Sequence, residues 1–171
     1  EFHYAWGAVG GTDAIMFGVD TVEPDMQPAL SGWASSDPQK AIEWFEALDM
    51  ENDSSFDPLL KDRKMKAEDL KNHLLGGLVQ GLSNSDPDLA IDYVKEVIDS
   101  GNRIGYRLMH APISAMIQTN SPSEAAQWAA QLDEGEIRNQ AMSRTADNYA
   151  KKDFEAAKEW AESFGSDNGE E

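Results

Sequence analysis

A repeated pattern of apolar positions constrains the fold of this chain more than any other feature of its sequence. Four dipeptides mark the copies: Asp37-Pro38, Asp86-Pro87, Ser121-Pro122 and Asp153-Phe154. We take the second residue of each dipeptide as the anchor of its copy. Every copy has an apolar residue five positions before the anchor, an alanine three after it, an aromatic residue six after it and an apolar residue ten after it. In chain order these residues are Trp33, Ala41, Trp44 and Leu48; Leu82, Ala90, Tyr93 and Val97; Ile117, Ala125, Trp128 and Leu132; and Tyr149, Ala157, Trp160 and Phe164. A period of some tens of residues is typical of repeat architectures, so these side chains are predicted to form one shared core.

The residues after each anchor predict an amphipathic helix. Apolar residues recur there at i, i+3, i+4 and i+7, which places them on one stripe of a helix. Proline at the anchor suits the first helical position, where its missing N–H is not needed. The residue before each anchor is therefore predicted to be a helix N-cap, worth about 1 kcal/mol: Asp37, Asp86, Ser121 and Asp153. Ser121 and Glu124 also have the spacing of a capping box.

A second amphipathic stretch precedes each anchor, and only a short turn separates the two stretches. Two helices joined so closely run antiparallel, so each copy is predicted to be a helical hairpin. We therefore predict an all-α fold in a single repeat domain over residues 1–171. The hairpins are expected at about 1–22, 25–48, 67–100, 103–133 and 135–164, with an insertion at 49–66 and a tail at 165–171. Pro112 falls within the expected third hairpin and predicts either a separate helical segment over 103–110 or a kink.

The first of these hairpins depends on a worn copy of the pattern. Trp6, Gly11, Ala14 and Phe17 stand at the offsets of the first apolar residue, the anchor, the alanine and the aromatic residue. The glycine-rich stretch from Gly7 to Thr12 is neither a dinucleotide-binding nor a phosphate-binding loop, because it lacks their glycine spacing and their lysine. A hairpin turn is the better interpretation.

The pattern resembles a known class of helical repeats. Trp33, Pro38, Ala41 and Trp44 match the degenerate bacterial repeat Trp-x4-Pro-x2-Ala-x2-Trp, and residues 24–164 are similar to tetratricopeptide-type and Sel1-like repeats. The resemblance implies a right-handed superhelix of antiparallel hairpins. It also implies a non-catalytic protein-binding scaffold whose concave surface holds a peptide or a partner helix.

The charge of the chain narrows the choice of partner. The sequence has 32 Asp and Glu against 14 Lys and Arg, a formal net charge of −18. A field of that sign repels nucleic acid and attracts basic molecules. No apolar run approaches the roughly 20 residues of a membrane span, and the absence of cysteine leaves a cytoplasmic or an exported location open. We therefore predict an interaction module that presents an acidic groove to a basic peptide or protein, with its oligomeric state undetermined.

Catalytic, cofactor and metal motifs are absent from the sequence, so no such residues are predicted. The segment from Asp49 to Asp57 resembles a calcium loop, but Ser54 replaces the required glycine and Leu60 replaces the bidentate glutamate. A solvated loop is the better interpretation of this segment.

The three histidines, His3, His73 and His110, do not have the spacing of a zinc site. His110 stands twelve positions before its anchor, where Met26 and Leu75 stand in two other copies. This position favours a hydrogen-bonded histidine in or near the core over a catalytic base.

Two other functions are weighed against the interaction module. The first is an enzyme, or an enzyme's helical subdomain, with a pocket of carboxylates around His110. The second is a fragment of a longer structural repeat array. An array fragment would leave an apolar face uncovered on its first or last helix, because true end repeats are polar outside.

Overall fold

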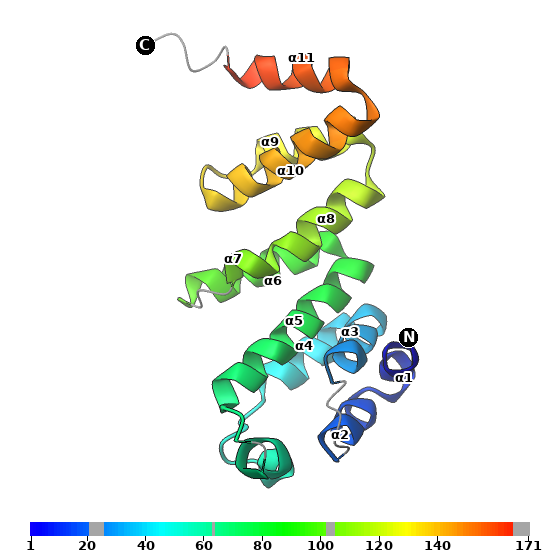
Figure 1. Cartoon of the computed structure of the whole chain (residues 1–171), viewed down its shortest axis with the longest axis vertical. Helices are drawn as coiled ribbons and strands as arrows, with labels where there is room; N and C mark the ends of the chain where they lie inside the picture. The colour runs from blue at the N-terminus through cyan, green and yellow to red at the C-terminus, as the bar shows by residue number, and fades with distance from the viewer. Residues whose placement is uncertain (21–25, 63, 102–104, 166–171) are drawn as a thin grey trace. The chain divides into compact units, whose positions relative to one another are not determined.

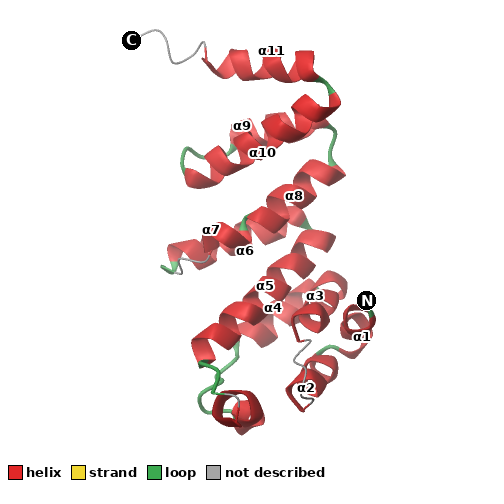
Figure 2. Cartoon of the chain, viewed as in Figure 1, coloured by secondary structure: helices red, strands yellow, loops and turns green. Residues whose placement is uncertain are grey.

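The computed structural model describes residues 1–20, 26–62, 64–101 and 105–165, and every regular element among them is a helix (Figure 2). The prediction of an all-α fold is confirmed for this part of the chain. A 3-10 helix, η1 (Ser54–Phe56), and a π-helical turn, η2 (Pro58–Asp62), lie between α4 and α5. The α-helices in chain order are α1 (Phe2–Gly10), α2 (Thr12–Asp20), α3 (Met26–Ser36), α4 (Pro38–Glu46), α5 (Ala67–Ser85), α6 (Pro87–Asp99), α7 (Gly105–Leu108), α8 (His110–Thr119), α9 (Pro122–Gln131), α10 (Glu136–Lys152) and α11 (Phe154–Gly165).

The helices form two compact units, residues 1–112 and residues 113–171. We call them the N-terminal and the C-terminal unit. In a repeat array each helix contacts mainly its neighbours, so an array that forms one domain can still separate into groups of contacting helices. The single domain over residues 1–171 therefore remains a prediction.

Consecutive helices pack against each other as hairpins within each unit. In the N-terminal unit α1 contacts α2, α3 contacts α4 and α5 contacts α6, and in the C-terminal unit α10 contacts α9 and α11 (Figure 1). The aromatic residues at two repeat positions meet inside two of these hairpins. The ring centroids of Trp33 and Trp44 lie 5.7 Å apart, and those of Tyr149 and Trp160 lie 6.3 Å apart. Equivalent residues thus make the same contact in the hairpins α3–α4 and α10–α11.

A side-chain cap begins four helices, α4, α6, α9 and α11. The carboxylate oxygen Oδ1 of Asp37, Asp86 and Asp153 accepts a hydrogen bond from the backbone N–H three residues later, at 3.4, 3.1 and 3.1 Å. Each of these aspartates has an extended backbone, with φ of −141°, −148° and −152°, which stops the preceding helix. Ser121 and Glu124 form a reciprocal capping box. Because the cap residue is also the connector, the turn is only one or two residues long.

The capping box of α9 makes stability depend on pH. The Ser121 hydroxyl and backbone N–H both hydrogen bond to the Glu124 carboxylate, and they hold the pKa of Glu124 below its ordinary value. A carboxyl with a lower pKa in the folded state contributes stability above its unfolded pKa and loses that contribution as pH falls through its folded pKa. Glu124→Ala is therefore expected to lower the melting temperature at neutral pH. The difference from the unchanged protein should shrink as the pH falls through the lowered pKa of Glu124, because the carboxylate is then protonated and neither protein carries a charge at this position. Thermal unfolding followed by circular dichroism at several pH values tests this, with Ser123→Ala, in the same helical turn, as the control.

The residues of the repeat pattern are covered to different degrees. The four alanines, Ala41, Ala90, Ala125 and Ala157, are buried, and so are Leu82, Tyr93 and Ile117. The remaining described members are half-buried: Trp33, Trp44, Leu48, Val97, Trp128, Leu132, Tyr149 and Trp160. The side chain of Phe164 lies outside the described residues. In the worn first copy Ala14 is buried, whereas Phe17 is exposed.

Glycines set the distance between the first helices of the N-terminal unit. A Cβ on Gly7 of α1 would overlap the carbonyl oxygen of Ala29 in α3, and one on Gly32 of α3 would overlap the carbonyl oxygen of Tyr4. A Cβ on Gly77 of α5 would lie 2.6 Å from the carbonyl oxygen of Gln27. Backbone therefore touches backbone from α1 to α3 and from α3 to α5, an approach that only a residue without Cβ allows.

The insertion at 49–66 contributes side chains to the core, and the interpretation of its segment from Asp49 to Asp57 as a solvated loop is wrong at Met50 and Phe56. Phe56 and Leu59 are 1% exposed and Met50 is 4% exposed. Both η1 and η2 contact α2. The acidic side chains that suggested a calcium loop are engaged locally: Asp53 Oδ1 accepts from the Ser55 N–H at 2.9 Å, and Asp57 pairs with Lys61 at 2.8 Å. Charged residues flank a few apolar residues in this segment, and composition alone does not reveal that these apolar residues are buried.

Two further expectations are resolved by the helix boundaries. Only Gly11 of the glycine-rich stretch forms the turn, with φ of +52°, while Gly7 and Gly10 lie inside α1. Pro112 does not kink a long helix: α7 and α8 are separate, and Pro112 lies in the first turn of α8, where a missing N–H costs nothing. Arg103 and Ile104, the start of the expected segment 103–110, lie outside the described residues.

Candidate functional site

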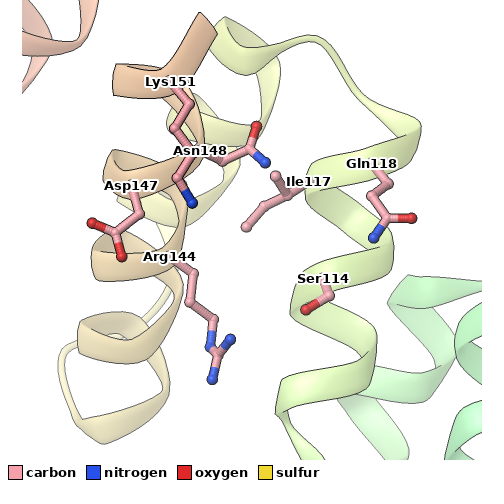
Figure 3. A pocket seen from close by; sticks show the side chains of 7 residues that line it. All are labelled: Ser114, Ile117, Gln118, Arg144, Asp147, Asn148 and Lys151. Carbon is pink, nitrogen blue, oxygen red and sulfur yellow. The ribbon is translucent and has the colours of Figure 1, made fainter. Parts of the chain in front are cut away.

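A polar groove lies between two helices of the C-terminal unit, α8 and α10. It has a volume of about 200 Å³. Figure 3 shows Ile117 of α8 and Asn148 of α10 pointing toward each other across the groove, with Ser114 and Arg144 further along it. The residues that line it are Ser114, Ile117 and Gln118 from α8 and Arg144, Asp147, Asn148 and Lys151 from α10.

The repeat positions explain why long polar side chains line this groove. Counted back from the anchors Pro38 and Pro87, the position six residues earlier is glycine in both copies, Gly32 and Gly81. The same position before Phe154 is Asn148. Ten residues before the anchor, Gly77 of α5 corresponds to Arg144 of α10. Where the N-terminal unit uses glycine to bring helix backbones together, α10 carries side chains that need space.

The groove concentrates hydrogen-bond donors in an otherwise acidic chain. Arg144 and Lys151 are two turns of helix apart on α10, and the amides of Asn148 on α10 and Gln118 on α8 also line the groove. Lys151 makes no ion pair within the described part of the chain, although Asp147 lies one turn before it. Guanidinium, ammonium and amide groups together suit a carboxylate or another oxyanion. The groove can therefore hold an anionic group, not the basic one expected of an acidic groove.

Two buried oxygens of α10, Thr145 Oγ1 and Asn148 Oδ1, accept no hydrogen bond from the described residues. Buried polar atoms are almost always paired in folded proteins, so each of these two calls for an explanation. Both residues are on α10, and Asn148 also lines the groove.

Two acidic side chains of the N-terminal unit act electrostatically on Tyr93 of α6. Tyr93 is 7% exposed, and burial together with the negative charges of Glu46 and Glu96 raises its pKa. Glu46 ends α4 and Glu96 lies in α6, so two hairpins contribute charge to one place. Both glutamates are exposed. We call Glu46, Tyr93 and Glu96 the acidic surface.

With one exception, the residues singled out from the sequence do not line the groove between α8 and α10. Among the described members of the repeat pattern, Ile117 alone lines the groove. The caps Asp37, Asp86, Ser121 and Asp153 do not line it. His110 is exposed, so its expected place in or near the core is wrong. The reason is the break before α8: the neighbouring Met109, with 0% exposure, takes the buried position, and His110 falls in the first turn.

Sequence reasoning missed Arg144, Asn148 and Lys151. The available signal is the replacement of glycine by long polar residues at equivalent repeat positions, which the apolar pattern does not include. Among the described residues, no three His, Asp or Glu side chains come together in a way that could hold a metal ion. No helix within the described ranges is both long and apolar enough to span a membrane.

Comparison with known proteins assigns no family to the chain. No protein-family model, curated protein or solved structure matches it. Its function is therefore argued from its own geometry.

Proposed function

We propose that this protein is a non-catalytic protein-binding module, a tetratricopeptide-like superhelix of hairpins that binds a basic peptide or protein. The observation that carries the proposal is that two exposed glutamates from different hairpins, Glu46 and Glu96, both act electrostatically on Tyr93. Two exposed carboxylates from different hairpins near one buried ring offer negative charge, and a Lys or Arg side chain of a partner can form ion pairs with them.

The chemistry of the groove supports a second contact of opposite sign. Arg144 and Lys151 can receive an acidic side chain of a partner.

The alternative of an enzyme has less support. Its nominated residue, His110, does not line the groove, and the groove contains one carboxylate, Asp147, beside two cations. The alternative of a longer structural array is judged by the outer face of α1, because an array fragment would leave an apolar face of its first or last helix uncovered.

A charge-reversal experiment tests the acidic surface. The probe is a fluorescein-labelled peptide with lysine at alternate positions, and binding is followed by fluorescence anisotropy. The double variant Glu46→Lys with Glu96→Lys is expected to weaken binding about tenfold, equivalent to about 1.4 kcal/mol. Binding of the unchanged protein should weaken as salt rises, because exposed charges are screened.

The matched control reverses two equally exposed acids in the first turn of α5, Glu68→Lys with Asp69→Lys. This pair changes the net charge by the same amount. If it weakens lysine-peptide binding as much as the first pair does, the acidic surface is not the site. A glutamate-for-lysine version of the peptide tests the groove in the same assay. Its binding should be lost in Lys151→Glu and kept in Lys158→Glu, a variant of an exposed lysine on α11.

A further inference from the structure

The groove between α8 and α10 has a positive local charge in an acidic chain. Helix α10 contains four Lys or Arg residues against two Asp or Glu residues, a net charge of +2, and α8 contains none of these residue types. The net charge of the whole chain is −18. Salt screens exposed charges beyond about 8 Å at physiological ionic strength, so the nearby cations decide what the groove attracts at contact distance.

The two cations of the groove occur in only one copy of the repeat. Arg144 stands ten residues before its anchor, Phe154, and Lys151 stands three residues before it. The other three copies have Pro28, Gly77 and Pro112 at the first position and Ser35, Asn84 and Thr119 at the second. The hairpins therefore form without cations at these positions, which points to binding as the use of the two that are present.

The two cations are too far apart along α10 to hold one small anionic group together. At a rise of 1.5 Å per residue, the Cα atoms of Arg144 and Lys151 lie about 10.5 Å apart. Figure 3 shows the Arg144 side chain extending away from Lys151, and the Asp147 carboxylate turned away from α8. The groove therefore suits two anionic groups about 10 Å apart.

Amide side chains can bind the main chain that connects two such groups. Asn148 stands between the two cations along α10, and Gln118 lines the groove from α8. The buried Oδ1 of Asn148 accepts no hydrogen bond from the described residues. The last torsion of an asparagine side chain is soft, so its rotation can turn this oxygen toward the groove. An amide then offers a donor and an acceptor, which match the C=O and N–H groups of a peptide.

We infer that the groove binds an acidic peptide segment in the polyproline II conformation, with two carboxylate side chains three residues apart. This conformation has three residues per turn and a rise of 3.1 Å per residue, so side chains i and i+3 lie on one face about 9 Å apart. Its main chain makes no internal hydrogen bonds, and its N–H and C=O groups can pair with Asn148 and Gln118. The inference deepens the second contact of the proposed function and does not depend on the acidic surface.

The size and the charge of the groove favour a protein segment over a small molecule or a nucleic acid. Its volume of about 200 Å³ is below the roughly 300 Å³ at which pockets for small molecules begin, so it holds part of a larger ligand. A nucleic acid would bring a long row of phosphates toward a chain with a net charge of −18. A segment with two carboxylates brings negative charge only where the groove has cations.

Isothermal titration calorimetry of the full chain with two peptides of about nine residues tests the inference. Both peptides are rich in proline, which favours polyproline II, and both contain two glutamates, three residues apart in the first and adjacent in the second. Their ends are acetylated and amidated to remove the terminal charges. We expect the first peptide to bind at least tenfold more tightly than the second. Equal affinities overturn the inference.

A free dicarboxylate separates recognition of a peptide from recognition of two charges. Suberate has a carboxylate at each end of a flexible carbon chain and has no amide groups. We expect that it does not displace the first peptide at equal concentration. Displacement at equal concentration would overturn the inference, because the groove would then bind two charges without a main chain.

Matched variants locate the site. Lys151→Gln is expected to weaken binding of the first peptide about tenfold and to remove its advantage over the second, because only one cation remains. Lys152→Gln removes the same charge from an exposed residue of α10 that does not line the groove, and both affinities should stay unchanged. Arg144→Gln should repeat the effect of Lys151→Gln without loss of helix content by circular dichroism. Equal weakening by Lys151→Gln and Lys152→Gln overturns the inference.

The charge reversal at the acidic surface distinguishes this inference from the proposed function. Glu46→Lys with Glu96→Lys should leave binding of the first peptide unchanged, because neither residue lines the groove. If the lysine peptide does not bind but the first glutamate peptide does, the acidic surface fails and the groove stands. The reverse result overturns the groove and leaves the acidic surface standing.

Discussion

Replacing Gly81 of α5 with alanine is expected to lower the free energy of unfolding of the N-terminal unit by about 1–3 kcal/mol. A Cβ at this position would overlap the Ser31 carbonyl oxygen and lie 2.6 Å from the Ala34 Cβ, so α3 and α5 would have to move apart. The clash is with backbone, which cannot rotate away. Urea denaturation followed by circular dichroism measures the loss, and hydrogen exchange of the α3 and α5 amides assigns it to this unit.

Gly76, in the same helix, provides the control. A Cβ there would meet only the end of the Gln27 side chain, at 3.2 Å, which can swing aside. Alanine has a higher helix propensity than glycine, so Gly76→Ala is expected to be neutral or to stabilise by up to about 1 kcal/mol. Equal losses for Gly76→Ala and Gly81→Ala would show that α5 does not approach α3 through its glycines.

Truncating Leu59 to alanine is expected to destabilise the N-terminal unit by about 2–5 kcal/mol. Leu59 is 1% exposed within η2, an element that contacts α2. Removing its side chain would leave a cavity against a helix that is otherwise anchored by Ala14, Ile15 and Val19. The size of the effect distinguishes a structural insertion from a loop, because truncation in a solvated loop changes stability by less than about 0.5 kcal/mol.

The neighbouring Leu60 is the matched comparison. It has the same side chain but is half-buried, so Leu60→Ala should cost clearly less than Leu59→Ala in the same denaturation experiment. A reversal of this order would mean that the two leucines have exchanged their inward and outward positions.

The candidate site could not be predicted from the apolar pattern. The pattern identifies side chains that prefer to be buried, and the groove is formed by residues at positions that the pattern ignores. Arg144 and Asn148 are unremarkable as single residues in a polar helix. They become significant only when α8 lies opposite α10, because the space between two helices depends on both of them. The predicted burial of His110 is wrong for a related reason. The helix breaks at Met109, so Met109 takes the buried position and His110 begins α8.

Local features of the fold were determined by the sequence alone. The helices, their starts at Pro38, Pro87 and Pro122 and the caps before them depend on interactions within a few residues, which neighbouring side chains decide. The tertiary structure decided which apolar surface is covered. Burial of Phe56 in the insertion, exposure of Phe2 on α1 and the glycine contacts of α3 depend on what lies across from each residue. Contacts between segments distant in the chain follow from the packing of whole helices, and no single stretch of sequence contains that information.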